Sequence, residues 1–374
     1  MEKSCPTNLH FLSPATIGSK SFSNRLVLAP MSRASAKPDG TPTREMANYY
    51  ADFSRGGFGL LIAEGAFVDD ICSQCYGNQP GLVTNSHEAG WQTVVEAVKR
   101  ENGKIILQLI HAGAVSQSVE TTFAPSPVRP RGQMLQGYGP RQGHYDVPRE
   151  LSVNDILSIG SAFVEATMRA EAAGFDGVEI HCANGYLLDQ FLTPETNLRS
   201  DTYGGKLENR LRLTTDILSM AQQRASPDFI VGVRLSQAKA TVQDYFWPNG
   251  LEDARVIFSE VAEAGADYIH LASEKGGYTY HSTAKTGENL TAFARSLTGL
   301  PVIANGGLQD IGLANQIIED QLADFVSIGK SAMLNPDLPK KIASGAPLRD
   351  FTFDMFKYGV SVNAQLKWEA EQHA

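Results

Sequence analysis

Short apolar runs recur along the chain, and each is followed by residues with the apolar spacing of an amphipathic helix. The runs lie at 24–31, 58–67, 104–113, 174–183, 229–236, 266–273, 301–307 and 323–330. They do not alternate between apolar and polar residues, which is typical of strands that are covered on both faces. The pattern therefore predicts eight buried strands.

Helical periodicity fills the intervals between these strands. The predicted helices span 43–56, 86–102, 152–174, 208–226, 251–265, 289–299, 310–323 and 335–345. Ser152 with Asp155 resembles an N-cap pair, and Gly174 and Gly265 stand where a glycine ends a helix. Eight successive strand–helix units favour an α/β fold, a single-domain (β/α)8 TIM barrel. A doubly wound open sheet is the alternative, but its usual signature, G-x-G-x-x-G, follows none of the predicted strands.

Three segments lie outside this repeat. Residues 8–22 precede the first strand, and we expect them to form an N-terminal cap on the floor of the barrel. Residues 114–150 form a long loop after strand three, at the end of the barrel where active sites lie, so we expect a lid. The tail, 347–374, is rich in aromatic residues, so we expect it to pack on the barrel. The whole chain, 1–374, is then one domain.

Composition adds one constraint. The formal net charge is −9, and a field of this sign repels nucleic acid and anionic membranes, so any phosphate site has to be built locally. No apolar run approaches the length of a membrane-spanning helix, and the first twenty residues lack the apolar core of a signal peptide. We therefore expect a cytoplasmic protein that binds neither nucleic acid nor membrane.

Cysteine is sparse, which fits a reducing compartment. The four cysteines are Cys5, Cys72, Cys75 and Cys182, and the second and third form the motif CSQC. Because no second pair or nearby His accompanies this motif, we interpret it as an incidental pairing in a loop and predict no metal site.

Active sites of TIM barrels lie where the strands end, so the residues at those ends are the candidate site. They are Ser32, Gly65, Gln108, His111, His181, Asn184, Tyr186, Arg234, Gly306, Gly307, Gly329 and Lys330. The chain has no HExxH or GxSxG motif and no carboxylate pair at neighbouring strand ends, so hydrolysis is not indicated. Ser32, Gln108 and Arg234 instead suit the edge of a polar heterocycle, although each alone is more often a structural hydrogen-bonding residue.

The last two predicted strands indicate a phosphate site. Gly306 and Gly307 follow the seventh strand, and Gly329 and Lys330 follow the eighth. These two loops are the habitual phosphate site of TIM barrels, where backbone N–H groups face the anion. Lys330 would add a compact positive charge. The alternative is that the glycines serve only tight turns and that Lys330 is solvated.

The segment 181–210, HCANGYLLDQFLTPETNLRSDTYGGKLENR, resembles the signature of the Old Yellow Enzyme family of flavin-dependent ene-reductases. The family pattern is H-x-A-x-G-Y-L-x-x-Q-F-L-x-P-x-x-N-x-R-x-D-x-Y-G-G-x-x-x-N-R, and every specified position matches. The stretches NRLVLAPMSR, EGAF, ILQL, GVRLS, PVIANGG and SIGKSAMLNPDL extend the resemblance over nearly the whole chain.

The resemblance implies an FMN-containing barrel that reduces activated alkenes with NADPH or NADH, passing hydride through flavin N5 in a ping-pong reaction. Carried over by position, the residues that would bind non-covalent FMN are Pro30, Met31, Ser32, Gly65, Gln108, Arg234, Gly306, Gly307, Gly329 and Lys330. His181 and Asn184 would hydrogen-bond the carbonyl or nitro oxygen of the substrate, as an oxyanion hole does. Tyr186 would donate the proton, and Tyr76 would line the substrate cleft.

The chain departs from the family pattern at several positions. Ser32 stands where one branch has Thr and another has Cys; its hydroxyl places the chain with the Thr-bearing branch. Lys330 replaces the usual Arg at the phosphate, which keeps the charge and loses the bidentate fork. Ile110 stands where Trp is common, which predicts a roomier pocket. Larger relatives carry an iron–sulfur cluster on cysteines beyond the barrel, and since no Cys follows Cys182 we expect no cluster here.

Two other functions stay open at this point. One is a nitro-ester or nitroaromatic reductase, because such substrates also present an oxygen to His181 and Asn184. The other is a protein that binds flavin and phenolic ligands without physiological turnover; the presence of Tyr186 argues against it, since a pure binder needs no proton donor. The sequence specifies neither the nicotinamide nor the oligomeric state.

Overall fold

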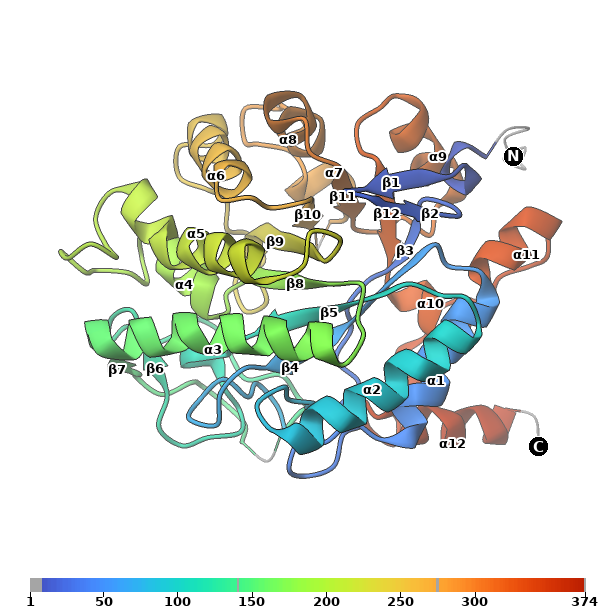
Figure 1. The fold of residues 1–374 in the computed structure, drawn as a ribbon, viewed down its shortest axis with the longest axis horizontal. Helices are drawn as coiled ribbons and strands as arrows, with labels where there is room; N and C mark the ends of the chain where they lie inside the picture. Colours follow the sequence, from blue (N-terminus) through green and yellow to red (C-terminus); the bar gives the residue numbers. More distant parts are fainter. Residues whose placement is uncertain (1–8, 140, 274–275, 373–374) are drawn as a thin grey trace.

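Eight parallel strands close into a barrel, and helices surround it (Figure 1). This computed structural model describes residues 9–139, 141–273 and 276–372. The barrel strands are β3 (Leu26–Leu28), β4 (Leu60–Phe67), β5 (Ile105–Ile110), β8 (Gly177–Asn184), β9 (Ile230–Lys239), β10 (Ile269–Ala272), β11 (Val302–Asn305) and β12 (Phe325–Ile328). Each pairs in parallel with the next, and β12 pairs with β3. The predicted single-domain (β/α)8 barrel is confirmed.

Seven of the predicted helices begin and end within a few residues of their expected bounds. They are α1 (Arg44–Gly56), α2 (Asn85–Arg100), α3 (Val153–Ala172), α5 (Leu207–Arg224), α6 (Leu251–Glu263), α8 (Leu290–Thr298) and α9 (Ile311–Glu319). Ser152 and Asp155 form a capping box at the start of α3. Gly174 and Gly265 follow the ends of their helices with positive φ, as predicted.

The last strand and helix are both present but shorter than predicted. The strand ends at Ile328, and Lys330 opens a short helix, α10 (Lys330–Leu334). The predicted helix at 335–345 is only α11 (Leu338–Ser344). The break between the two helices falls at Asn335, which precedes Pro336, and a residue before proline is disfavoured in helical conformation.

A hairpin seals the floor of the barrel. It consists of β1 (Ala15–Ile17) and β2 (Lys20–Phe22), which pair in antiparallel fashion, and it follows the turn η1 (His10–Leu12). Ile17 and Phe22 pack against the inward side chains of Val27, Leu60, Ile62, Ile106, Ile230, Tyr268, Ile303 and Phe325. The predicted N-terminal cap is confirmed for the described residues of 8–22; residue 8, like Cys5, lies outside them.

The remaining elements were not predicted. They are η2 (Gly113–Val115), β6 (Phe123–Ala124), β7 (Arg149–Glu150), α4 (Leu187–Leu192), α7 (Tyr278–His281), η3 (Phe353–Phe356) and α12 (Val362–Gln372). The tail packs on the barrel through Met355 and Trp368, which contact Met333 and Leu334. None of the helices in the described part of the chain combines the length and apolar character needed to cross a membrane.

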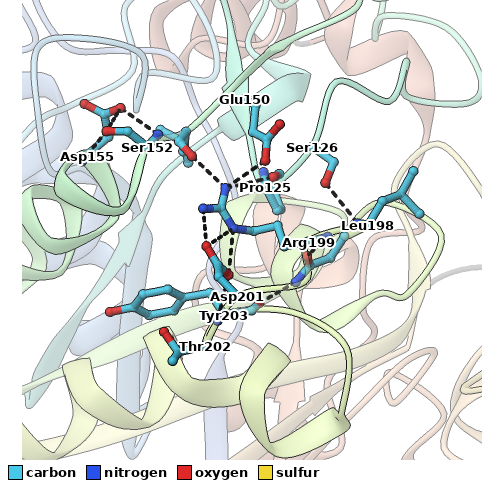
Figure 2. A network of polar contacts seen from close by, with 12 residues as sticks. Pro125, Ser126, Glu150, Ser152, Asp155, Leu198, Arg199, Asp201, Thr202 and Tyr203 are labelled. Carbon is cyan, nitrogen blue, oxygen red and sulfur yellow. Dashed lines mark hydrogen bonds and ion pairs between the residues drawn. The ribbon is translucent and has the colours of Figure 1, made fainter.

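Arg199 fastens the long loop 114–150 to the segment after α4 (Figure 2). Its guanidinium forms a bidentate pair with Asp201, with an Nη2–Oδ2 distance of 2.6 Å. The same side chain donates to the carbonyl of Pro125, within the loop, at 3.1 Å and to that of Leu151, directly after the loop, at 2.6 Å. Ser126 adds a contact, since its Oγ accepts the Leu198 N–H at 2.9 Å. This part of the matched signature therefore anchors a loop.

Candidate active site

A cavity of about 610 Å³ opens at the C-terminal ends of the barrel strands. Among the predicted site residues, those that line it are Pro30, Met31, Ser32, Tyr76, Asn184, Tyr186, Arg234, Gly306, Gly307, Gly329 and Lys330. Gly65, Gln108 and His181 belong to the strands beside the cavity but are not among its lining residues. The fold thus gathers residues that lie up to 300 positions apart, because parallel strands end at the same rim.

A second hollow of about 610 Å³ lies at the opposite end of the barrel, beside the hairpin. Its charged residues satisfy one another. Arg25 donates to the Asp324 carbonyl at 2.9 Å, and Arg295 Nε donates to the Asp324 carboxylate at 3.1 Å. This hollow offers no polar group that needs a ligand, so the site is the cavity at the strand ends.

One end of the cavity is built from backbone. Gly306 has a φ of 111° and no space for a side chain, because a Cβ there would lie 2.7 Å from the Tyr278 nitrogen. Only glycine fits this close approach. A Cβ on Gly307 would meet nothing within 4 Å, so this peptide faces open space. Lys330 stands at the same end, with its ammonium 5.6 Å from the centre of the Phe353 ring.

The barrel wall beside the cavity holds a buried polar network centred on Glu179. Gln108 Nε2 donates to Glu179 Oε1 at 2.8 Å, and Tyr268 donates to Oε2 at 3.0 Å. His270 Nδ1 lies 2.8 Å from the same Oε2, and its Nε2 lies 2.9 Å from Ser327 Oγ. A carboxylate only accepts hydrogen bonds, so the Gln108 side-chain nitrogen must face Glu179. The Gln108 side-chain oxygen is then left to accept a hydrogen bond from another group.

Glu179 is ionised in this setting. Burial alone would raise the pKa of the carboxyl, but His270, Arg234 and the Gln108 hydrogen bond outweigh burial and lower the pKa to about 2. The negative charge balances the buried Arg234. Burial and Arg234 lower the pKa of His270, which favours a neutral ring. The wall therefore carries one buried cation and one buried anion.

His181 and Arg234 carry polar atoms without partners. His181 lies opposite Arg234 in the β8–β9 register. Within the described residues, His181 Nδ1 and Arg234 Nε are buried and have no hydrogen-bond partner. Burial and then the charge of Arg234 lower the pKa of His181 to about 3, so this ring is neutral near neutral pH. Buried polar atoms are rarely left unpaired unless a ligand or water completes them.

The turn after β8 presents the other two predicted residues. Asn184 and Gly185 both have left-handed backbone conformations, with φ of 60° and 84°. The Asn184 N–H donates to Ser236 Oγ at 2.7 Å, and the Gly185 N–H donates to Asp189 Oδ2 at 2.6 Å. Tyr186 follows and is the N-cap residue of α4. The turn thereby places Asn184 and Tyr186 along the cavity.

Tyrosines surround the mouth of the cavity. The hydroxyl groups of Tyr76 and Tyr186 are hydrogen-bonded to each other, and the Tyr186 ring lies 5.2 Å from that of His181. Burial raises the pKa of Tyr186, and the neighbouring Tyr76 raises it further, so the phenol is protonated at neutral pH. Ile110 packs against both tyrosines. The result is an apolar cluster with one hydroxyl pair directed at the site.

His111 and the CSQC motif do not join the site. His111 Nε2 lies 2.9 Å from Asp69 Oδ2 and 3.8 Å from Cys72 Sγ, and its Nδ1 accepts the Gly113 N–H at 3.1 Å. Cys72 and Cys75 are buried free thiols. Within 9–139, 141–273 and 276–372, no three His, Cys, Asp or Glu side chains come together as metal ligands do. This cluster fixes the loop after β4.

The sequence analysis missed some lining residues and the network behind them. Leu135 and Tyr138 of the 114–150 loop line the cavity, and the Tyr138 ring lies 4.7 Å from that of Tyr76. Phe356 of the tail also reaches it. Glu179 was visible in the sequence as one of two carboxylates in the apolar run 174–183, and a buried carboxylate requires a partner. Nothing in the local sequence marks His270 as that partner.

The residues present fit a flavin mononucleotide. The cavity joins a backbone-lined end with Lys330 to a wall with the unpaired Arg234 Nε and an accepting Gln108 oxygen. A flavin needs a phosphate site at one end and hydrogen-bonding groups along the edge of its ring. Gly65 keeps the wall close, since a Cβ there would lie 2.8 Å from Ile110 Cγ2. No dinucleotide fingerprint is present for a larger cofactor.

Comparisons with known proteins agree with this fit. A model of the NADH:flavin oxidoreductase / NADH oxidase family matches residues 10–349. A putative 12-oxophytodienoate reductase 2 of Oryza sativa subsp. japonica is 32% identical over 348 residues, which cover 92% of this chain and 90% of the relative. An NADH oxidase of Thermoanaerobacter brockii is also 32% identical, over 353 residues and 90% of this chain. The chain spans only about half, 51%, of that longer protein.

Solved structures share the fold. The old yellow enzyme homologue from Zymomonas mobilis superposes with a TM-score of 0.81 at 28% identity, covering 92% of this chain and 96% of the other. Morphinone reductase in complex with tetrahydroNAD gives a TM-score of 0.79 at 30% identity, covering 93% and 94%. The similarity thus extends over nearly all of both chains.

Proposed function

Because the chain belongs to the NADH:flavin oxidoreductase / NADH oxidase family, the family of the Old Yellow Enzymes, we propose that it is an FMN-dependent NAD(P)H oxidoreductase that reduces activated alkenes. The reduced bond would be the C=C of an α,β-unsaturated carbonyl or nitro compound. One observation carries this proposal: a single cavity holds a phosphate-type end at Lys330 and a donor set that includes Asn184 and Tyr186.

FMN would bind non-covalently along the cavity. Gly306, Gly307, Gly329 and Lys330 would hold the phosphate, Gln108 and Arg234 would bind the pyrimidine edge and ribityl chain, and Pro30, Met31, Ser32 and Gly65 would line one side of the ring. When bound, FMN would supply the hydride chemistry at N5 that links the nicotinamide to the alkene, and use of one site by both in turn would imply ping-pong kinetics. The positive charge of Arg234 at the ring favours the added electron density of the reduced state.

His181 and Asn184 would bind the oxygen of the substrate. The support is that His181 is neutral, with its pKa lowered to about 3 by burial and by Arg234, so it donates a hydrogen bond without carrying a charge. Negative charge develops on this oxygen as hydride reaches the β-carbon, and fixed donors stabilise it. A nitro oxygen would meet the same donors.

Tyr186 would donate the proton to the α-carbon. If the Tyr76 hydroxyl donates to the Tyr186 oxygen, the Tyr186 proton is free to leave, and the resulting tyrosinate keeps one hydrogen bond. The contact between the two hydroxyl groups allows either one to donate. Burial raises the Tyr186 pKa and keeps the group protonated until a strong base forms. We propose that the 114–150 loop acts as a lid, because Leu135 and Tyr138 line the same space.

The nicotinamide would enter the same cavity as the alkene. Morphinone reductase has been solved with tetrahydroNAD, and a barrel of the same architecture here offers one cavity of about 610 Å³ for both partners. Binding at one place in turn is what ping-pong kinetics requires. Anaerobic titration with NADPH and with NADH would show which of the two reduces the bound flavin more readily.

The direct test is the flavin content and the activity of the purified protein. We expect yellow protein whose released flavin has the mass of FMN, and NAD(P)H oxidation that 2-cyclohexenone stimulates. Protein that contains FAD, or that cannot be reconstituted with FMN, would rule out the cofactor assignment. Protein that binds FMN and phenols but reduces no enone or nitroalkene would favour the ligand-binding alternative.

A further inference from the structure

The proposed chemistry leaves one buried ion pair without a role. Lys239, the last residue of β9, places its ammonium 2.5 Å from Asp189 Oδ1 in α4. The side-chain exposure is 8% for Lys239 and 0% for Asp189. Burying such a pair costs several kcal/mol of desolvation per ion, and apolar residues often replace it without loss of stability. The presence of this ion pair is therefore better explained by a role in its surroundings than by stability alone.

The pair is bonded to the backbone of the turn that carries Asn184 and Tyr186. The second oxygen of Asp189 accepts the Gly185 N–H at 2.6 Å, while its first oxygen accepts from Lys239 and from Thr193 Oγ1. Asn184 has a φ of 60°, a left-handed conformation that is less favourable for a residue with a Cβ than for glycine. A charged acceptor holds an amide about twice as strongly as a neutral one does.

Lys239 is itself fixed on both sides. The β8–β9 register shifts after Cys182 so that Asn184 lies opposite Lys239, and the next residue, Ala240, donates its N–H to the Asn184 carbonyl at 2.9 Å. The ammonium also lies 4.5 Å from the centre of the Tyr245 ring. The ion pair therefore links the far end of β9 to the turn without lining the main cavity.

We propose that Asp189 and Lys239 are positioning residues, whose ion pair holds the Asn184–Gly185 peptide in the left-handed turn that directs Asn184 and Tyr186 into the cavity. This inference rests on the proposed function, because the conformation of the turn matters for catalysis only if a substrate binds in the cavity. Its claim about the turn is independent of turnover.

The proposal predicts a distinctive pH dependence when the ammonium is removed. Burial raises the pKa of Asp189, and Lys239 opposes that effect. Without Lys239 the carboxyl takes up a proton more readily and becomes a weaker acceptor for the Gly185 N–H. The other titratable groups near Asp189 include Cys182, whose pKa burial raises to about 12, and Tyr245, whose pKa burial also raises. Glu195, Arg129 and Arg131 line the same small cavity as Asp189. A transition that appears in Lys239→Met and is absent when Asp189→Asn is added would belong to Asp189.

The experiment compares FMN-loaded wild type with Lys239→Met, Lys239→Arg and the surface control Lys340→Met between pH 5.5 and 9. The readouts are hydrogen exchange of peptides covering 184–190 and the dissociation constant of p-chlorophenol, read from the charge-transfer band. In Lys239→Met we expect faster exchange and roughly tenfold weaker phenol binding at low pH, both recovering as pH rises. Lys239→Arg should restore both values, and FMN retention should stay unchanged in all variants.

Wild-type exchange and phenol affinity in Lys239→Met at every pH would overturn the proposal. If that variant does not fold, the charge-free pair Asp189→Asn with Lys239→Met replaces it, and should show weak phenol binding and fast exchange with no pH dependence. Wild-type values in the double variant would also overturn the proposal. If wild-type enzyme reduces no alkene, the proposed function fails, while exchange and phenol affinity still decide the role of the pair.

Discussion

The same eight strands form two different ends of the barrel interior: an apolar floor and a polar rim. On β5, Ile106 faces the floor and Gln108, two residues later, faces the site; on β9, Ile230 and Arg234 divide the strand in the same way. The floor is closed by apolar side chains that are at most 2% exposed. The rim is lined by amides, charges and tyrosine hydroxyls, and the imidazoles of His181 and His270 lie in the wall beside it.

The difference shows where the fold is complete and where it needs a ligand. Apolar side chains on the floor require only close packing, and the hairpin supplies it. At the rim each polar group requires a specific partner, and Glu179 provides one for Gln108 and His270. His181 Nδ1 and Arg234 Nε still lack one within the described residues. We therefore expect changes at the rim to act on ligands and chemistry, and changes at the floor to act on stability.

The largest effect is expected from Tyr186→Phe, which keeps the ring and removes the hydroxyl. Reduction by NAD(P)H needs no proton from this group, so the reductive half-reaction should stay within a few-fold of wild type. Oxidation by 2-cyclohexenone should slow by about 10²–10⁴-fold, the usual contribution of a positioned general acid. Stopped-flow measurement of the two half-reactions separately checks this expectation.

Two comparisons make that result specific. Nitroalkenes should be affected less than cyclohexenone, because the nitronate formed by hydride transfer is stable enough to await a proton. Tyr76→Phe leaves the Tyr186 phenol in place and should cost less than Tyr186→Phe. A wild-type rate with cyclohexenone in Tyr186→Phe would make Tyr186 a structural aromatic residue.

At the floor, Phe325→Ala should lower stability with little effect on chemistry. Phe325 is fully buried and its ring lies 5.8 Å from that of Phe22, edge to face. Truncating a buried Phe to Ala costs about 3–5 kcal/mol. Urea unfolding of the FMN-loaded protein measures the loss, and the folded fraction should keep its rates within a few-fold. A tenfold slower hydride step with unchanged stability would contradict the division between the two ends.

The sequence predicted the barrel and most of the rim because both depend on local patterns. Apolar runs mark buried strands, and polar residues or glycines directly after a run, such as Ser32 and Lys330, fall at the rim of a closed barrel. The last helix begins at Leu338, three residues later than predicted, because Asn335 precedes Pro336 and is disfavoured in helical conformation. The matched signature has two parts in the structure: Asn184 and Tyr186 line the cavity, and Arg199 anchors a loop.

What the sequence could not give are contacts between distant segments. His270 lies 91 residues from Glu179, and Lys239 lies 50 residues from Asp189. No local pattern pairs them, because the pairing follows from the barrel register. Tyr138 belongs to a long loop whose path depends on contacts with distant residues. Its contact with the Tyr76 ring is therefore visible only in the structure.

A smaller effect is expected at the phosphate end of the rim. Lys330→Glu replaces an attractive charge with a repulsive one beside the proposed phosphate, and we expect FMN to dissociate roughly ten to a hundred times more readily. Titration of the apoprotein, followed by quenching of flavin fluorescence, measures the change. Lys340→Glu makes the same change of charge on the exposed surface and should leave FMN affinity unaltered. Equal affinities in the two variants would remove Lys330 from the site.

The smallest effect concerns the pH dependence of His181, and it separates a neutral donor from a charged one. An ordinary histidine has a pKa of 6.5, but burial and then Arg234 lower the pKa of His181 to about 3. The dissociation constant of 2-cyclohexenone, a ligand that does not titrate, should therefore show no inflection near pH 6.5. An inflection there that disappears in His181→Asn would mean that the imidazolium binds the oxygen.

The same lowered pKa of His181 should make the free energy of unfolding depend on pH. Between pH 6.5 and 3 the unfolded chain binds a proton at this position and the folded chain does not. The stability that the neutral ring contributes is thus fully present above about pH 6.5 and is lost progressively as pH falls toward 3. His181→Asn cannot titrate, so its difference in urea midpoint from wild type should shift in favour of the variant between pH 7.5 and 5. A difference that stays constant would mean that His181 already accepts a proton in the folded protein, and Arg234 would then need a stronger counter-charge than Glu179 provides.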